Sequence, residues 1–177
     1  MKFRLLTTIS LLLTTILCFA EDYPVPEKRQ ELLFYIQRNH NANTIVYDAI
    51  FDAQGDLDSQ QPVSVYWIRY QEQGQTMKLR TIERMFAYGA RSHRIRGVEN
   101  EFNLKLVAKK DKDFRLVQTE KNKAVVYTTI NDQECILDHM YIFADNTKLR
   151  PKVKYVEVFG FDKESGEEVY EKIIINE

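Results

Sequence analysis

Val63-Ser-Val-Tyr-Trp-Ile68 and Val153-Lys-Tyr-Val-Glu-Val-Phe159 decide the fold, because β-branched and aromatic residues, which favour strands, dominate both stretches. Similar stretches recur along the chain with apolar residues at a period of two, separated by clusters of Gly, Asn, Asp or Pro. This pattern predicts nine β-strands, at residues 32–38, 44–52, 63–70, 101–108, 114–119, 124–130, 135–144, 153–161 and 169–175.

One segment departs from the period of two. Residues 76–87 place Leu79, Ile82 and Phe86 at helical spacing, and Gly89 follows as a stop signal, so we predict a single short helix there. Several strands are apolar on both faces. We therefore expect the apolar face of the helix to pack on the sheet and cover it.

The intervening turns predict antiparallel hairpins between sequential strands. The predicted fold is therefore all-β and mainly antiparallel, a barrel-like closed meander of eight to nine strands with one short helix. A two-sheet β-sandwich remains the alternative, because periodicity does not distinguish one closed sheet from two facing sheets. No repeat or Pro-rich linker divides the chain, so residues 21–177 are predicted to form a single β domain.

The N-terminus has the pattern of a secretory signal peptide. Residues 1–20 begin with two basic residues, continue as an apolar run that is too short to span a bilayer, and end with small residues at positions 18 and 20. We expect export to the periplasm or beyond the cell. Lipoprotein anchoring at Cys18 is the less favoured alternative, because Leu17 stands where lipoprotein processing requires a small residue.

Composition excludes several classes of protein. The 26 acidic and 25 basic residues nearly balance, so the whole chain has no net field that attracts nucleic acid or an anionic membrane. Cys135 is the only cysteine left after signal cleavage, which excludes an intramolecular disulfide. We interpret it as a small buried hydrophobe. A dyad with His139 is disfavoured, because four residues along one strand face span about 13 Å.

No motif of a catalytic or cofactor site is present. The three histidines lack metal-ligand spacing, no Gly-x-Ser-x-Gly elbow occurs, and no Gly-rich phosphate loop occurs. We predict neither a metal nor a cofactor. Catalysis by scattered acidic residues, as in an unrecognised hydrolase, is the least favoured hypothesis.

Several segments together resemble a known family. They include Phe34-Tyr-Ile-Gln-Arg-Asn39, Pro62-Val-Ser-Val-Tyr-Trp-Ile68, Ala87-Tyr-Gly89, Cys135-Ile-Leu137 and Val156-Glu-Val-Phe-Gly160. This ordered series is similar to the family catalogued as domain of unknown function 4833, from about Leu32 to Ile173. The resemblance implies a single-domain, often exported protein, and it implies no reaction, ligand or catalytic residue.

The first candidate site consists of polar residues that share strand parity with core residues. Arg38, Arg69 and Glu157 have this parity, and Arg38 or Arg69 is predicted to meet Glu157 or Asp48 inside the barrel. Such a pair is either a structural ion pair or the polar floor of a ligand pocket. The candidate ligand-binding residues are Tyr35, Arg38, Asp48, Trp67, Arg69, Tyr155 and Glu157.

Aromatic and basic residues form two further candidates. Tyr47, Tyr66, Tyr70, Tyr141 and Phe143 join Tyr35 and Trp67 as residues that can stack on a sugar or an apolar ligand, although strands favour aromatics for packing alone. Arg80, Arg84, Arg91 and His93, with Arg94 and Arg96 after them, are either an anion or partner surface or a solvated basic face.

The favoured hypothesis is an exported, non-catalytic binding or accessory module that holds a small apolar or aromatic-stacking ligand in the barrel or at its mouth. Another envelope protein is the alternative partner. The alternative is a structural or protein-interaction module with a filled core. A cavity of several hundred cubic ångströms lined by Trp67, Tyr35 and Tyr155 would favour the first.

Overall fold

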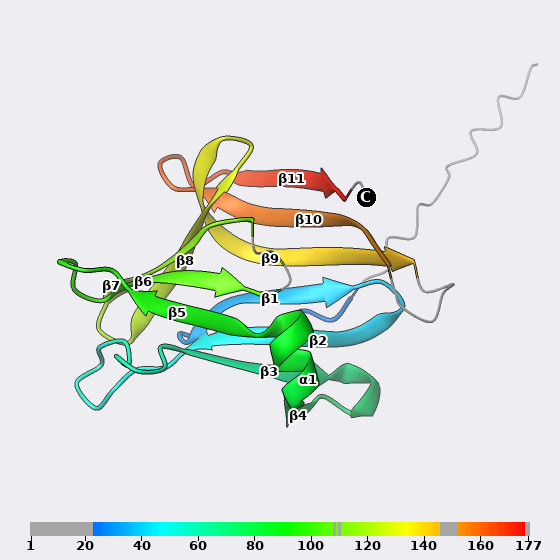
Figure 1. The fold of residues 1–177 in the computed structure, drawn as a ribbon, viewed down its shortest axis with the longest axis horizontal. Helices are drawn as coiled ribbons and strands as arrows, with labels where there is room; N and C mark the ends of the chain where they lie inside the picture. Colours follow the sequence, from blue (N-terminus) through cyan, green and yellow to red (C-terminus); the bar gives the residue numbers. More distant parts are fainter. Residues whose placement is uncertain (1–22, 108, 110, 146–151, 176–177) are drawn as a thin grey trace, which may run out of the picture.

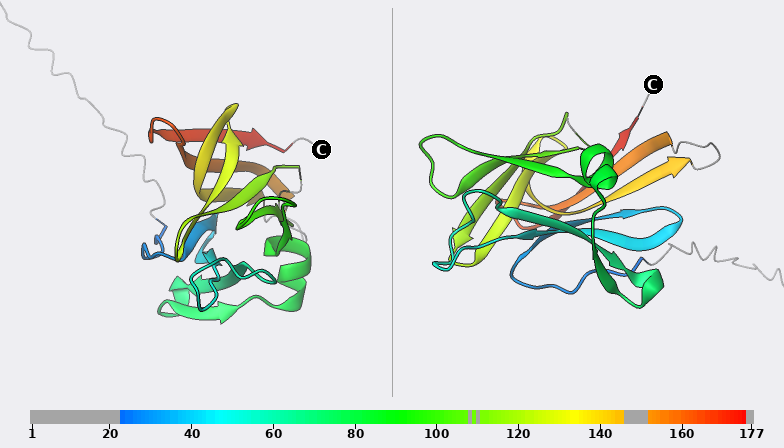
Figure 2. Two further views of the ribbon diagram at one scale, coloured as in Figure 1. Left: turned by 90° about the vertical axis from the view of Figure 1, so that its left-hand side faces the viewer. Right: turned by 60° about the horizontal axis from the view of Figure 1, so that its bottom comes forward.

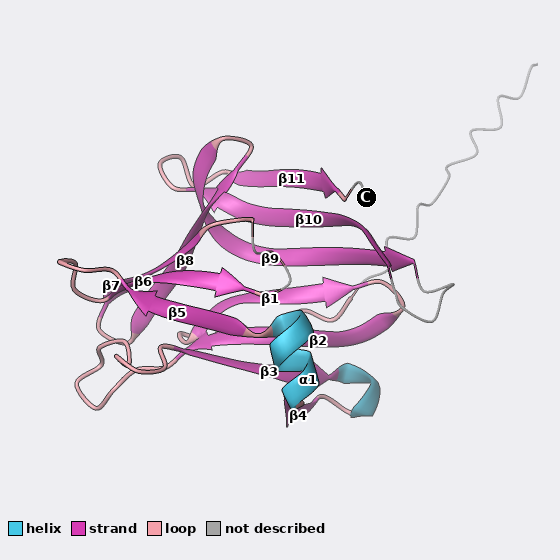
Figure 3. Cartoon of the chain, in the orientation of Figure 1, coloured by secondary structure: helices cyan, strands magenta, loops and turns pink. Residues whose placement is uncertain are grey.

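Strands dominate the computed structural model, which describes residues 23–107, 109, 111–145 and 152–175 (Figure 1, Figure 3). The predicted signal peptide at residues 1–20 and Cys18 lie outside the described residues. The elements are β1 (Leu32–Arg38), β2 (Asn41–Ala49), β3 (Val63–Arg69), η1 (Tyr70–Glu72), β4 (Gln75–Lys78), α1 (Thr81–Glu83), η2 (Arg84–Tyr88), β5 (Ala90–Arg94), β6 (Glu101–Leu106), β7 (Phe114–Glu120), β8 (Lys123–Ile130), β9 (Gln133–Asp145), β10 (Lys152–Asp162) and β11 (Glu168–Ile174).

The long strand β9 gives the sheet its shape. Its first part pairs antiparallel with β8, and its second part pairs parallel with β1, where Tyr35 lies opposite His139. Two arms therefore leave the same edge of β9, one in the order β1-β2-β3-β4 and the other in the order β8-β7-β6-β5, while β10 and β11 extend the other edge. Figure 2 shows both arms curling around one interior as a half-barrel.

The hydrophobic core lies between the two arms. Ile36, Ile45 and Tyr47 contribute from one arm, and Leu104 and Leu116 contribute from the other, all of them completely shielded from solvent. Alternate residues of each strand point inward, as the period of two in the sequence requires. Burial of this apolar surface is the main contribution to the stability of the half-barrel.

The nine predicted strands and the mainly antiparallel all-β fold are confirmed. The sheet has eleven strands, two more than predicted, and the two additional strands are β4 and β5. It does not close completely, since β4 and β5 end the two arms without pairing to each other in the described part of the chain. The parallel β1–β9 pair is also new, because a meander of hairpins contains only antiparallel neighbours.

A β-bulge in β9 inserts one extra residue into the strand. Residues after the bulge therefore point to the face opposite to the one that regular alternation predicts. Leu137 lies opposite Gly160, but His139 lies opposite the preceding residue, Phe159, so Asp138 is the extra residue. Cys135 is therefore buried in the core, as predicted, whereas His139 stacks between Tyr35 and Phe159 on the outer face. The expectation that Cys135 and His139 share a face is wrong.

Gly160 allows β10 to approach this bulge closely. A Cβ atom at residue 160 would lie 2.5 Å from the carbonyl oxygen of Ile136 and 2.8 Å from Cδ1 of Ile130. Both distances are shorter than any tolerated contact, so only glycine fits here.

The helix is shorter than predicted, and its apolar face points away from the protein. Residues 75–78 form strand β4, and the helix occupies residues 81–88, as α1 followed by the π-helical turn η2. Of its predicted apolar face, only Leu79 is buried, whereas Ile82 and Phe86 are 66% and 72% exposed. The expectation that this face packs on the sheet is wrong, because the partly polar side with Glu83 and Ala87 faces the protein instead.

Candidate functional site

A groove of about 740 Å³ lies at the seam where the two arms of the half-barrel face each other without pairing. One wall is β3 with the preceding loop and the end of β4, and the other wall is β5. Its lining residues, which define the seam groove, are Gln60, Gln61, Val63, Ser64, Val65, Tyr66, Lys78, Leu79, Arg84, Ala90, Arg91, Ser92, His93 and Leu104.

The seam groove exists because both walls are unpaired strand edges. β4 covers β3 only from Tyr66 to Arg69, so the edge at Val63 and Val65 stays open. β5 pairs only with β6 in the described part of the chain, so its second edge faces the groove. Val63, Leu79 and Leu104 are buried and form an apolar floor between these edges.

Basic side chains surround this apolar floor. Lys78, Arg84, Arg91 and His93 line the groove, and no Asp or Glu is among the lining residues. None of the four forms an ion pair with a described carboxylate, whereas many basic residues elsewhere do. Arg115, for example, bonds both Glu101 and Glu134. The groove therefore carries uncompensated positive charge, which favours an anion.

Asp48, which contacts the groove residue Tyr66, is already paired with a cation. The Tyr66 hydroxyl donates a hydrogen bond to Asp48 Oδ2 at 2.7 Å, and Arg29 bridges the same carboxylate at 2.9 Å. Burial is the largest influence on the pKa of Asp48 and raises it, and burial also raises the pKa of Tyr66 to about 12. Asp48 is thus paired with Arg29 and does not offset the basic rim.

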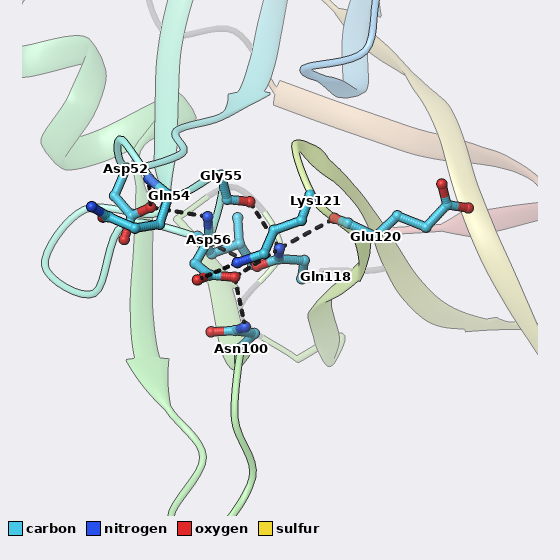
Figure 4. A network of polar contacts seen from close by, with 9 residues as sticks. Asp52, Gln54, Gly55, Asp56, Asn100, Gln118, Glu120 and Lys121 are labelled. Carbon is cyan, nitrogen blue, oxygen red and sulfur yellow. Dashed lines mark hydrogen bonds and ion pairs between the residues drawn. The ribbon is translucent and has the colours of Figure 1, made fainter.

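Two connections, one at each end of the seam, hold the two arms of the half-barrel together. At one end the helix connects β4 directly to β5 (Figure 1). At the other end, Asp56 in the β2–β3 loop accepts hydrogen bonds from Lys121 at 2.6 Å, Gln118 at 3.2 Å and Asn100 at 3.3 Å, all from the opposite arm (Figure 4). The Lys121 hydrogen bond is the largest of the effects that lower the pKa of Asp56.

Two residues of the predicted ligand set meet next to the helix. The Arg38 guanidinium lies 5.3 Å from the centre of the Trp67 ring and donates to the Tyr88 hydroxyl at 3.1 Å. Tyr88 packs edge-on against Trp67, and its carbonyl accepts a hydrogen bond of 2.7 Å from the fully buried Tyr47. These contacts fill the interior and attach the end of the helix to it.

The other predicted ligand residues are dispersed. Arg69 pairs with Glu72, Glu157 with Lys172, and Asp48 with Arg29, so the predicted pairing of Arg38 or Arg69 with Glu157 or Asp48 is wrong. Glu157 does share a face with Tyr155 and Phe159, but Val156 and Val158 are the buried residues of β10, so that face is the outer one. Tyr35 and Tyr155 lie on the outer face, away from Trp67, so these three rings do not line one cavity.

The rings of the outer face stack on one another rather than outward. Tyr35 and His139 stack with ring centres 5.0 Å apart, His139 and Phe159 at 4.2 Å, and Phe143 and Tyr155 at 4.9 Å. Each of these rings has at least one face covered by a ring of a neighbouring strand, and Lys172 lies over the Tyr155 ring. This arrangement leaves little aromatic face for a sugar or another stacking ligand.

Of the predicted anion-binding residues, Arg84, Arg91 and His93 come together in the seam groove, and Arg80 does not line it. The structure adds Lys78 and the apolar floor. Sequence spacing could not identify these, because the groove joins β3 to β5 across two arms that are brought together only by the fold.

The fold and groove together define an all-β half-barrel with a basic, apolar-floored groove at its open seam. The chain belongs to the family described as domain of unknown function (DUF4833), which matches residues 34–172. No curated protein and no solved structure is detectably similar to the chain.

Two further observations concern the described residues. No three His, Cys, Asp or Glu side chains among them gather as a metal site requires. Within the same part of the chain, no helix combines the length and the apolar character needed to span a bilayer.

Proposed function

We propose that this protein is an exported, non-catalytic binding module whose seam groove holds a small amphipathic anion, a molecule with an aliphatic part and one acidic group. The single observation that carries the proposal is one groove of about 740 Å³ that combines an apolar floor, no lining carboxylate and four basic side chains without an ion pair to a described carboxylate. Sites of this volume are typical of small-molecule ligands.

The two halves of such a ligand match two parts of the groove. Val63, Leu79 and Leu104 offer apolar surface to an aliphatic chain. Arg84 and Arg91 can donate paired hydrogen bonds to a carboxylate or a phosphate, which a lysine in their place would not do as well. The fixed seam means that the groove needs little rearrangement to bind, which lowers the entropic cost of binding.

Calorimetric titration with dodecanoate tests this proposal, with dodecanol and acetate as the two half-ligands. Dodecanoate is expected to bind, and each half-ligand alone is expected to bind far more weakly. Arg84→Gln and Arg91→Gln should each weaken the Kd for dodecanoate by about tenfold, because each removes a charge-assisted hydrogen bond. Lys154→Gln, which removes an exposed cation of β10 outside the groove, should leave the Kd unchanged.

Native mass spectrometry of protein purified gently from its own host provides a second readout. A reproducible extra mass of a small acidic molecule, lost in Arg91→Gln, supports the proposal. No heat with dodecanoate together with a bare protein mass would exclude it, as would equal binding of dodecanol and dodecanoate.

A further inference from the structure

The helix at residues 81–88 turns its apolar side away from the protein. Ile82, Met85 and Phe86, which we name the helix crest, are 66%, 57% and 72% exposed. Their spacing of three and four residues places them on one continuous stripe. The opposite side carries Glu83, whose carboxylate accepts hydrogen bonds from the Trp67 indole at 3.3 Å and from the Arg80 amide at 2.8 Å.

An amphipathic helix in a globular protein ordinarily packs the other way, with its apolar stripe against the core. Here the buried Trp67 indole has its hydrogen-bond acceptor on the helix, and this contact fixes the polar side inward. Single exposed apolar residues are ordinary, but three large ones on adjacent helical turns indicate a binding surface.

The charge around the helix crest indicates what covers it. Residues 78–96 contain six Lys or Arg and one acidic residue, Glu83, in a protein whose net charge is −1. Arg80 directly precedes the helix that carries the crest, and it forms no ion pair with a described carboxylate. Basic residues are therefore enriched in the segment of the chain that carries the crest.

We propose that the helix crest docks this protein on an anionic lipid bilayer, with Ile82, Met85 and Phe86 inserted below the headgroups and Arg80 at the phosphate level. Exposed apolar side chains bordered by cations are the chemistry of interfacial helices. A second copy of the chain fits less well, because crest against crest would bring Arg80 next to its own copy. The crest and its lipid partner are independent of the ligand in the seam groove.

The position of the helix agrees with this orientation. It stands at the rim of the molecule, joining β4 to β5 outside the curled sheet (Figures 1 and 2). Insertion therefore requires no opening of the half-barrel. The crest residues do not line the seam groove, so the two surfaces can be altered separately.

Vesicle flotation tests the docking surface. The mature protein should float with phosphatidylglycerol-rich vesicles and not with pure phosphatidylcholine vesicles, and high salt should release it. The double variant Ile82→Ser/Phe86→Ser should lose about tenfold in vesicle affinity for each side chain, because each gives up its apolar burial. Arg80→Gln should weaken binding to phosphatidylglycerol vesicles as well.

The matched control is Val98→Ser/Ile174→Ser, which removes two apolar side chains, 41% and 56% exposed, from other parts of the surface. It should float like the wild type. The crest variant should keep the wild-type Tm and dodecanoate binding, which separates loss of docking from loss of fold or groove. The proposal would be overturned if the protein did not float, if flotation did not depend on lipid charge, or if the crest variant floated like the wild type. It would also be overturned if the wild type were a dimer and the crest variant a monomer.

Discussion

Trp67 donates its indole N–H to Glu83 Oε2 at 3.3 Å, and this hydrogen bond joins the core of the half-barrel to the helix at its seam. Trp67 is almost completely buried, so its N–H needs an acceptor within the protein. Glu83 supplies that acceptor and also caps the start of the helix through the Arg80 amide. One carboxylate thus determines where the helix begins and which side of it faces the protein.

Glu83→Ala should therefore loosen the helix without unfolding the sheet. It removes two hydrogen bonds, and we expect a loss of about 1–3 kcal/mol in the free energy of unfolding, measured by urea titration. The emission of Trp67, the only tryptophan, should shift to the red as its ring gains contact with water. Glu83→Gln keeps an acceptor oxygen and should lose less of the free energy of unfolding. Equal losses in the two variants would contradict the role of Glu83 as a hydrogen-bond acceptor.

Gly89→Ala should destabilise the protein through contact and not through its backbone angles. A Cβ at residue 89 would lie 1.9 Å from the carbonyl oxygen of Arg84, so the π-helical turn must be remade. We expect a loss of about 3 kcal/mol or more in the free energy of unfolding, as for severe overpacking.

Gly74→Ala is the matched control for Gly89→Ala. Gly74 has a φ of +75° but no atom within 4 Å of an added Cβ, so alanine there costs only backbone strain of about 1 kcal/mol. A comparable loss in both variants would show that the close contact at residue 89 is relieved cheaply.

Acid should weaken the hold between the two arms at Asp56. Its pKa lies below the ordinary value of 3.8, so folding favours the ionised carboxylate. The resulting stabilisation is complete above pH 3.8 and is lost as the pH falls through the lowered pKa. Asp56→Asn should reduce stability at pH 7 and flatten its decline in acid, as measured by denaturant midpoints. Asp113→Asn, at an exposed aspartate that forms an ion pair with Lys105, should change the stability at pH 7 and its decline in acid much less.

Alkali should weaken the protein through Tyr66. Burial raises its pKa from 10.0 to about 12, so folding favours the protonated phenol. Stability from this group is complete below pH 10 and is lost as the pH rises through about 12. Tyr66→Phe should reduce the slope of stability against pH in that interval. An ultraviolet titration in which every tyrosine of the native protein ionises near pH 10 would contradict the assignment.

The sequence was sufficient to predict the strands that carry a clear apolar pattern and insufficient for the two strands that lack one. All four residues of β4 are exposed, and β5 is mostly polar, so neither shows the apolar period that marks the other nine strands. The parallel pairing of β1 with β9 was not predictable either. It joins Tyr35 to His139 across most of the chain, and local turn signals carry no information about such a contact.

The candidate site was predicted in part for a related reason. Arg84, Arg91 and His93 are close in sequence and their basic character was visible, but the opposite wall at Val63 and Tyr66 is supplied by the other arm. The orientation of the helix was missed because an apolar stripe at Ile82 and Phe86 does not reveal whether protein or another surface covers it. The predicted pairing with Glu157 failed because β10 is apolar on both faces, and its sequence does not show that Val156 and Val158 face the core while Glu157 lies on the outer face.

The pairing of β1 with β9 also constrains the time course of folding. β1 is among the first strands to leave the ribosome or a translocation channel, yet the strand that covers its second edge ends only at Asp145. Closing a loop of that length is slow compared with forming a hairpin. The β1–β2 hairpin must therefore wait with an open apolar edge until most of the chain has emerged. That interval, and not the finished half-barrel, is when the polypeptide is most exposed to aggregation and most in need of a chaperone.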